Sequence, residues 1–144
     1  MTLHIIKLAV GIRDVEHLAE VQQRRLKESR RGSRKGKLFH RTRNRPRREE
    51  LLLDGGSMYW VVKGRICVRQ RLLGFESDKD EEGRPFCRML IDPKLVETEF
   101  WPHRAFQGWR YLQPADAPRD RTGRRGKGDL PPEMAAELRE LGLI

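Results

Sequence analysis

Cysteine is scarce in this chain of 144 residues, which contains only Cys67 and Cys87. Two thiols that lie far apart and form no CxxC motif exclude a disulfide-stapled scaffold and a cysteine-based zinc site. We expect both to be small buried residues. The histidines are equally dispersed, with no pair at helical spacing, so no metal and no cofactor is predicted. These histidines are His4, His17, His40 and His103.

Long hydrophobic runs are also absent. A membrane-spanning helix needs about 18 consecutive apolar residues, and no segment approaches that length. The apolar run within residues 1–10 is too short for a secretory signal and shows no small-residue cleavage site. We therefore expect a soluble, cytoplasmic protein with no membrane partner.

What the chain has in excess is charge. Hydrophobic residues make up 37% of it and charged residues 36%, so the hydrophobic core must be small. The length fits one domain of ordinary size. We predict a single domain over residues 1–144, with a formal net charge of +10.

The positive charge is concentrated in one segment. Residues 24–48 hold thirteen of the 31 Lys and Arg residues and a single acid, Glu28. The remainder carries 18 basic and 20 acidic residues and is nearly neutral. Because like charges repel and apolar residues are few, we expect a flexible basic segment at about residues 29–45. A second basic loop is expected at about residues 117–129.

The density of arginine in the first segment indicates contact with phosphates. A planar guanidinium suits phosphate oxygens, and neutralised phosphates release counterions, which makes such binding strong and salt-dependent. The alternative is a solvated segment that only aids solubility. The candidate phosphate-binding residues of this segment are Arg30, Arg31, Arg34, Lys35, Lys37, Arg41, Arg43, Arg45, Arg47 and Arg48.

Apolar periodicity predicts a few short helices and a β-rich centre. Asp14 is placed to cap the first helix, and Gly55 and Gly56 are placed to end the second. The expected helices cover residues 14–27, 47–53 and 133–141; the expected strands cover 3–10, 38–43, 57–63, 65–75, 86–92, 96–100 and 108–112, with an exposed hairpin loop at 77–83. This pattern favours an α+β protein built on a small mixed β-barrel with a few short helices. An open α+β sheet is the alternative.

Two motifs resemble those of a known family. They are LLLDGGSMYWVVKG at residues 51–64 and AFQGWRYL at residues 105–112. With the opening MTLHIIKLAVG and the closing LPPEMAAELRELGL, they resemble a family of short, basic alphaproteobacterial proteins that form a domain of unknown function. The resemblance covers nearly the whole chain and implies no activity.

A second resemblance involves residues 49–75. A short helix ending in Asp-Gly-Gly, a strand, a Lys-Gly turn and a basic strand are similar to the first half of PUA-like barrels, including the ASCH type. In those domains a cleft of the barrel holds RNA or a modified nucleoside. Residues 55–58 (GGSM) depart from the Gly-Lys-Lys-Thr-type turn of ASCH domains.

The strand predicted at residues 65–75 offers a basic lining for such a cleft, together with Lys63 before it. Alternate residues of a strand share a face. Arg65, Arg69 and Arg71 are therefore expected to form a row along which a nucleic-acid backbone would run. Ordinary outward-facing residues of a half-exposed sheet are the alternative.

Residues 106–110 (FQGWR) are expected to form the floor of the cleft, where Trp109 and Arg110 line it. Unpaired bases stack on aromatic rings, and the polar neighbours of Trp109 indicate partial exposure. A small barrel also uses large aromatic residues as core, which is the alternative for this tryptophan.

Catalysis has the weakest support. Ser57, Thr42 and Cys67 are candidate nucleophiles, but none has a base at a spacing that implies contact. ASCH-type amidohydrolases use a lysine and a glutamate as acid and base, and Lys63 and Glu76 are the matching residues here. Lysine and glutamate on neighbouring strands are also a common exposed pair. No catalytic residue is assigned.

Together these features predict an RNA-binding module. The basic segment would bind phosphates, and the barrel cleft would bind unpaired or modified bases. RNA is favoured over DNA because no groove-reading helix is visible and aromatic strand surfaces suit unpaired bases. Ribosomal or transfer RNA is the expected partner. The alternatives are a small amidohydrolase-like enzyme acting on a modified nucleoside, and a protein–protein adaptor that docks on an acidic partner.

Overall fold

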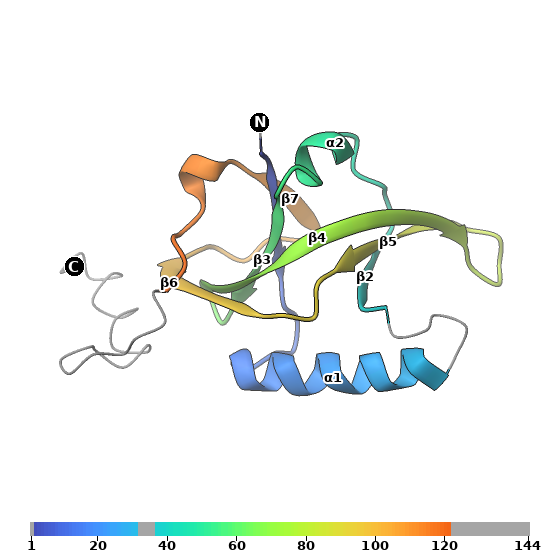
Figure 1. The fold of residues 1–144 in the computed structure, drawn as a ribbon, viewed down its shortest axis with the longest axis horizontal. Helices are drawn as coiled ribbons and strands as arrows, with labels where there is room; N and C mark the ends of the chain where they lie inside the picture. The colour runs from blue at the N-terminus through green and yellow to red at the C-terminus, as the bar shows by residue number, and fades with distance from the viewer. Residues whose placement is uncertain (1, 32–36, 122–144) are drawn as a thin grey trace.

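The computed structural model describes residues 2–31 and 37–121, which form an α+β fold around one mixed sheet of seven strands (Figure 1). The strand order is β2-β5-β4-β3-β1-β7, and β6 also pairs with β4. The predicted α+β class is confirmed, although the sheet remains open where a closed barrel was expected. The elements are β1 (His4–Leu8), α1 (Val15–Arg31), β2 (Phe39–Thr42), α2 (Glu49–Leu52), β3 (Ser57–Val62), β4 (Arg65–Lys79), β5 (Pro85–Ile91), β6 (Val96–Pro102), β7 (Trp109–Leu112) and the 3-10 turn η1 (Pro114–Asp116).

The long strand β4 organises the sheet. Its first half pairs with β3 on one side and β6 on the other, and its second half pairs with β5. Strands β5 and β6 therefore follow one another along the same side of β4. Beyond β3 the sheet continues with β1, which is parallel to β3, and with β7, which is antiparallel to β1.

Both faces of the central strands are covered. All six residues of β3 are buried, which explains why this strand is apolar throughout instead of alternating. One core includes Met58 and Trp60 and packs against α1 through Leu18. The other core includes Tyr59 and Val61 and is covered by Phe106 and Ala117 from the segments on either side of β7.

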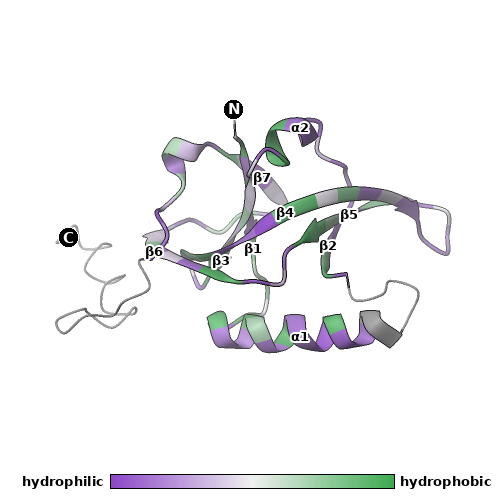
Figure 2. Ribbon diagram, in the orientation of Figure 1, coloured by the Kyte–Doolittle hydropathy of each residue, from purple (hydrophilic) through white to green (hydrophobic). Residues whose placement is uncertain are grey.

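Helix α1 begins as predicted and continues further than predicted. The Asp14 carboxylate accepts a hydrogen bond from the backbone N–H of His17 at 2.7 Å, so Asp14 is the N-cap. Hydrophobic residues recur along the helix between hydrophilic ones (Figure 2). The helix was expected to end near residue 27, but its backbone extends to Arg31. The expected flexible segment therefore supplies the end of α1 and also strand β2.

The hairpin between β4 and β5 is longer than predicted. Residues 77–79, expected in an exposed loop, belong to β4 and pair with β5. The turn is confined to the following residues, where the Asp80 carboxylate accepts hydrogen bonds from the N–H groups of Glu82 and Arg84. Charged residues are tolerated in this strand because Arg88 of β5 pairs with Asp78 across the ladder at 2.8 Å.

A β-bulge in β4 overturns the expected row of arginines. Val61 lies opposite Ile66, whereas Trp60 lies opposite Val68, so β4 contains one extra residue at this point. An extra residue reverses the alternation of side chains. Two odd-numbered residues of β4 therefore point to opposite faces of the sheet when one precedes the bulge and the other follows it. Arg65 does not share a face with Arg69 and Arg71.

The remaining predicted strands are present, with boundaries that differ by a few residues. The helix expected at residues 133–141 and most of the loop expected at 117–129 lie outside the described residues. No helix within residues 2–31 and 37–121 is long and apolar enough to span a membrane.

Gly56 joins α2 to β3 where three backbone segments meet. Its N–H donates to the carbonyl oxygen of Leu52 at 3.0 Å, which ends the helix as predicted from the Gly-Gly pair. A Cβ atom at this position would collide with the carbonyl oxygens of both Leu52 and Leu3. Neither oxygen belongs to a flexible side chain, so the site cannot relax cheaply.

We expect Gly56→Ala to lower the free energy of unfolding by about 3 kcal/mol, because backbone atoms must move to admit the methyl group. Chemical denaturation of the wild type and the variant measures this loss. Gly74→Ala is the matched control, since its Cβ would meet only the Leu90 side chain at an ordinary 3.5 Å. Equal stability of the two variants would contradict the close approach at Gly56.

Candidate functional site

The residues predicted to bind nucleic acid lie in several separate places. Arg30 and Arg31 belong to the last turn of α1, and Arg34 and Lys35 lie outside the described residues. The others are Lys37 and Arg41 at β2; Arg43, Arg45, Arg47 and Arg48 between β2 and α2; Lys63, Arg65, Arg69 and Arg71 on the β3–β4 hairpin; and Trp109 and Arg110 on β7.

The loop between β2 and α2 holds exposed arginines of the predicted set. Arg43, Arg47 and Arg48 are exposed, and none forms an ion pair with another residue of the described ranges. The Tyr111 hydroxyl accepts hydrogen bonds from the backbone N–H groups of Arg47 and Arg48, which anchors this end of the loop to β7. Arg45 instead forms a two-pronged hydrogen bond with Glu49, both contacts at 2.7 Å.

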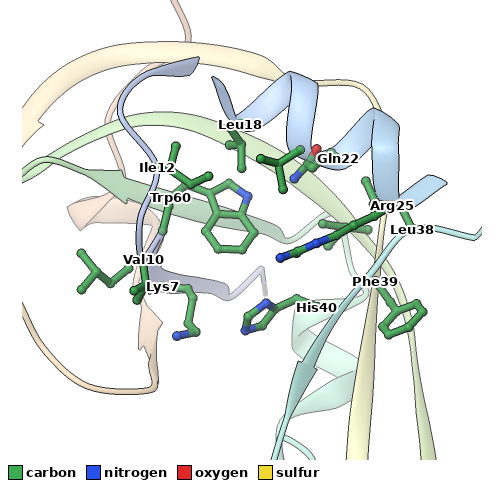
Figure 3. Close-up of a pocket in the computed structure, with 14 residues that line it drawn as sticks. Lys7, Val10, Ile12, Leu18, Gln22, Arg25, Leu38, Phe39, His40 and Trp60 are labelled. Carbon is green, nitrogen blue, oxygen red and sulfur yellow. The ribbon is translucent and has the colours of Figure 1, made fainter. Parts of the chain in front are cut away.

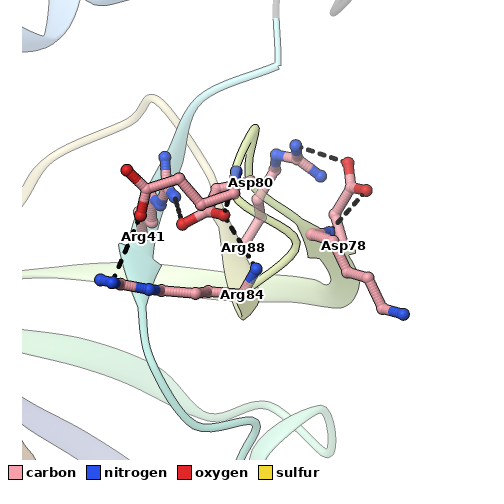
Figure 4. A network of polar contacts seen from close by, with 7 residues as sticks. Arg41, Asp78, Asp80, Arg84 and Arg88 are labelled. Atoms are coloured by element: carbon pink, nitrogen blue, oxygen red, sulfur yellow. Dashed lines mark hydrogen bonds and ion pairs between the residues drawn. The ribbon is translucent and has the colours of Figure 1, made fainter.

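On β2 the predicted cations already have partners. Lys37 lies 3.5 Å from Glu76. The Arg41 guanidinium stacks 3.8 Å from the centre of the Phe86 ring and lies 3.9 Å from Asp80 (Figure 4). Arg88 stacks on the same ring at 4.6 Å, so Phe86 lies in contact with two guanidinium groups. This cluster braces β2 against the β4–β5 hairpin.

Arg69 has a structural role in the fold. It forms two hydrogen bonds of 2.7 Å with the Asp120 carboxylate and a third, of 2.9 Å, with the Ser57 hydroxyl. The guanidinium holds the pKa of Asp120 below its usual value, chiefly through these hydrogen bonds. Arg69 thereby ties the segment after β7 to β3 and β4.

The expected cleft of Lys63, Arg69, Trp109 and Arg110 is not assembled. Lys63 occupies the tight turn between β3 and β4, with a φ of 48°. Trp109 lies opposite Lys7 and packs against the first core, whereas Arg110 lies opposite Ile6 of the second core. Trp109 and Arg110 therefore point to opposite faces of the sheet, because neighbours along a strand alternate.

The structure instead forms a pocket between α1 and the sheet. The nitrogen-bearing ends of Lys7, Arg25 and His40 gather around one space beside the Trp60 indole (Figure 3). These side chains come from β1, α1, β2 and β3. Apolar residues complete the walls, and the deep part has a volume of about 170 Å³. No acidic residue lines this part among the residues that the structure describes.

The electrostatics of the pocket follow from burial without a counterion. Burial, together with the nearby charges of Lys7 and Arg25, lowers the pKa of His40 to about 4. His40 is therefore neutral at pH 7 in the unliganded protein. Burial also lowers the pKa of Lys7. A half-buried ammonium without an ion-pair partner in the described residues favours a bound anion.

The inner wall of the pocket is held by a buried amide network. Gln70 of β4 is fully buried and exchanges two hydrogen bonds with Gln22 of α1, at 2.7 and 2.8 Å. The Gln70 carbonyl oxygen also accepts from the Trp60 indole N–H, and its NH₂ group also donates to the backbone oxygen of Asp92. Each polar atom of the Gln70 amide is thus satisfied, and the helix is fixed in register over the sheet.

The pocket opens into a wider groove between α1 and β2. This groove has a volume of about 500 Å³ and shares Arg25, Leu38, Phe39 and His40 with the deep part. Lys37, Arg41 and one acid, Glu28, complete its lining. The volume of the groove falls in the range of small-molecule sites, which measure about 300–1,000 Å³.

Sequence reasoning missed this pocket, although two signals were present. Lys7 occupies an inward position of β1, in phase with Leu3 and Ile5 of the first core. Gln22 follows Leu18 by four residues and interrupts the apolar stripe of α1. Polar residues at core positions indicate either a buried network or a ligand site, and here they form a buried network and part of the lining of a pocket.

The candidate catalytic residues are not arranged for catalysis. Ser57 is 1% exposed, and its hydroxyl accepts a hydrogen bond from Arg69, not from a base. Burial raises the pKa of Cys67 to about 12, which suppresses the thiolate. Lys63 occupies the turn before β4, whereas Glu76 lies near the other end of that strand and pairs with Lys37, so the candidate acid–base pair is not brought together. The described residues also contain no group of three or more side chains that could hold a metal.

These features define a small α+β protein in which one helix covers an open mixed sheet and leaves a basic groove along its side. The chain belongs to the family described as a protein of unknown function, DUF1489, whose model matches residues 5–144. The predicted membership of a family of unknown function is confirmed. Neither the curated proteins nor the solved structures contain a match.

The Gln70 network predicts a strong dependence of stability on one amide. Gln70→Leu leaves the Trp60 N–H, Gln22 and the Asp92 carbonyl without their buried partner, and we expect it to cost about 3 kcal/mol of unfolding free energy. Denaturant titration followed by tryptophan fluorescence measures the loss. Gln23→Leu, on the exposed side of α1, should change stability by less than about 0.5 kcal/mol. Similar losses in both variants would show that the network does not act as described.

The Arg69–Asp120 pair predicts a pH-dependent contribution to stability. Asp120 is 46% exposed, so we expect Asp120→Asn to cost only about 1 kcal/mol at neutral pH. The pKa of Asp120 is depressed in the folded state, so this contribution is present above the ordinary aspartate pKa of about 3.9 and disappears as the pH falls through the depressed value. Denaturation curves at several pH values should show the wild type and variant converging in acid. Asp116→Asn is the exposed control, and a difference that persists undiminished in acid would refute the pair.

Proposed function

We propose that this protein binds RNA through the basic groove between α1 and β2 and the arginines that follow β2. The observation that carries the proposal is that β2 connects two basic features: the pocket and groove, whose linings contain Lys7, Arg25, Lys37 and Arg41, and the loop of exposed arginines that follows this strand. Cationic groups clustered on one side suit a polyanion.

Three loop arginines supply most of the expected affinity. Arg43, Arg47 and Arg48 are exposed and form no ion pair within the described residues. By contrast, Arg45 and Arg69 are engaged by carboxylates and contribute mainly to the fold. The proposal therefore retains the basic segment of the sequence prediction and moves selectivity from the expected barrel cleft to the groove.

The groove favours single-stranded RNA over a duplex. Phe39 and His40 line it beside the cations, and aromatic side chains offer surfaces on which unpaired bases stack. Helix α1 packs one face against the sheet and so is not presented as a free recognition helix. A PUA-like role on ribosomal or transfer RNA is part of the proposal, and it rests on the sequence resemblance of residues 49–75.

Neutralising the loop arginines should reduce both affinity and salt dependence. Each phosphate contact with a single strand contributes about 0.7 to the slope of log K against log salt. We expect the variant Arg43→Gln/Arg47→Gln/Arg48→Gln to lose about 2 from this slope. Fluorescence anisotropy with a labelled single-stranded RNA, at salt concentrations from about 50 to 200 mM, measures the change.

The matched control removes the same charge elsewhere. Lys94, Arg104 and Arg119 are exposed and line neither the pocket nor the groove, so changing all three to Gln should leave the slope nearly unchanged. If both triple variants lose the same amount from the salt slope, the binding is unspecific electrostatic attraction and the loop has no particular role in it. Absence of RNA binding, combined with capture of an acidic protein that survives nuclease treatment, would favour the adaptor alternative.

A further inference from the structure

The deep pocket beside Trp60 places three nitrogen-bearing side chains where the described residues supply no acidic partner. Lys7, Arg25 and His40 converge from a strand, a helix and a second strand (Figure 3). The register places Lys7 between Trp60 of β3 and Trp109 of β7. The neighbouring groove contains one acid, Glu28, and the deep part contains none among the described residues.

The unpaired charge of Lys7 lowers the stability of the folded state. It occupies an inward strand position, and the structure gives it no hydrogen-bond or ion-pair partner within the described residues. Removing a charge from water without pairing it destabilises the folded state. Residues that lower stability in this way cluster at functional sites, because the bound ligand supplies the missing interaction.

The size of the deep part selects a small ligand group. About 170 Å³ corresponds to the volume of five or six water molecules at about 30 Å³ each. That space is sufficient for a phosphate group. The wider groove of about 500 Å³ begins at Arg25, Phe39 and His40, and it offers room for the nucleoside attached to that phosphate.

We propose that the pocket formed by Lys7, Arg25, His40 and Trp60 binds a phosphomonoester of a nucleotide, carried either by an RNA end or by a free nucleoside monophosphate. A terminal phosphate presents three unesterified oxygens and close to two negative charges, which matches three converging nitrogen-bearing groups better than a backbone diester does. Lys7 and Arg25 supply the charge, and the neutral imidazole of His40 donates a hydrogen bond. The nucleoside lies along Phe39.

This inference rests on the proposed function and names its ligand. It assigns the deep pocket to the chain end and leaves the loop arginines to internal phosphates. Binding at the deep pocket requires a terminal phosphate, whereas binding by the loop arginines varies with salt concentration and strand length.

The test compares three RNA oligonucleotides of one sequence: one with a 5′-phosphate, one with a 3′-phosphate, and one with hydroxyls at both ends. We expect the wild type to bind one phosphorylated form about tenfold or more tightly than the unphosphorylated form, because charge-assisted hydrogen bonds are strong. Lys7→Met should abolish this preference. Adenosine monophosphate and inorganic phosphate, titrated calorimetrically, form separate arms that identify the source of the phosphate.

Stability of the variant separates binding from folding. Lys7→Met removes an unpaired half-buried charge, so its thermal midpoint should equal or exceed that of the wild type. Lys7→Arg retains the charge and should keep part of the preference. Arg43→Met is the control, and it should weaken binding of all three oligonucleotides by a similar factor.

Each outcome decides between the two proposals. A preference for a phosphorylated end that Lys7→Met removes supports the pocket, as does binding of the free monophosphate that the same variant removes. Equal affinity for all three oligonucleotides, with no binding of the monophosphate, overturns the pocket and leaves RNA binding intact. If Lys7→Met weakens the binding of all three oligonucleotides equally, Lys7 contacts an ordinary backbone phosphate. That result also overturns the pocket. No binding of any RNA overturns the proposed function, and the monophosphate arm then decides the pocket alone.

Discussion

The buried amide of Gln70 is the interaction on which the arrangement of this protein depends. It is one residue of β4, yet it bonds α1 through Gln22, β3 through Trp60 and the β5–β6 connection through Asp92. An amide at 0% exposure is stable only where all its hydrogen bonds are made. The helix must therefore lie in one register over the sheet. Because that register sets the distance between α1 and β2, it also sets the width of the groove between them.

Charge in this protein divides into two kinds that the sequence does not distinguish. Some arginines are building elements: Arg69 holds the segment after β7 through Asp120, and Arg88 stacks on Phe86 while pairing with Asp78. Others, between β2 and α2, project without acidic partners in the described residues. A paired guanidinium has already exchanged water for a carboxylate, whereas an exposed one remains available to a phosphate. The proposed RNA surface is built from the second kind.

Much of the fold was predictable because its causes are local. The Asp14 cap, the glycine end of α2, the Lys63-Gly64 turn and the buried β3 each depend on a few neighbouring residues. The expected row of Arg65, Arg69 and Arg71 was wrong, because a bulge opposite Trp60 and Val61 reverses the alternation. A bulge is set by pairing with another strand, and nothing in a single strand's pattern reports it. Likewise, the polar residues at 77–79 indicated a loop, but pairing with β5 makes them strand.

The sequence by itself determined the class of the fold, the family, and the presence of a dense basic segment near the start of the chain. Composition and local periodicity suffice for these, because propensity, capping and charge act over a few residues. Only the tertiary structure decided which cationic side chains lie close together. Lys7, Arg25, His40 and Trp60 are separated by many residues, and they converge because β1 pairs with β3 while α1 crosses the sheet. A site of this kind is a property of strand order and helix register, and these are settled by packing across the whole domain.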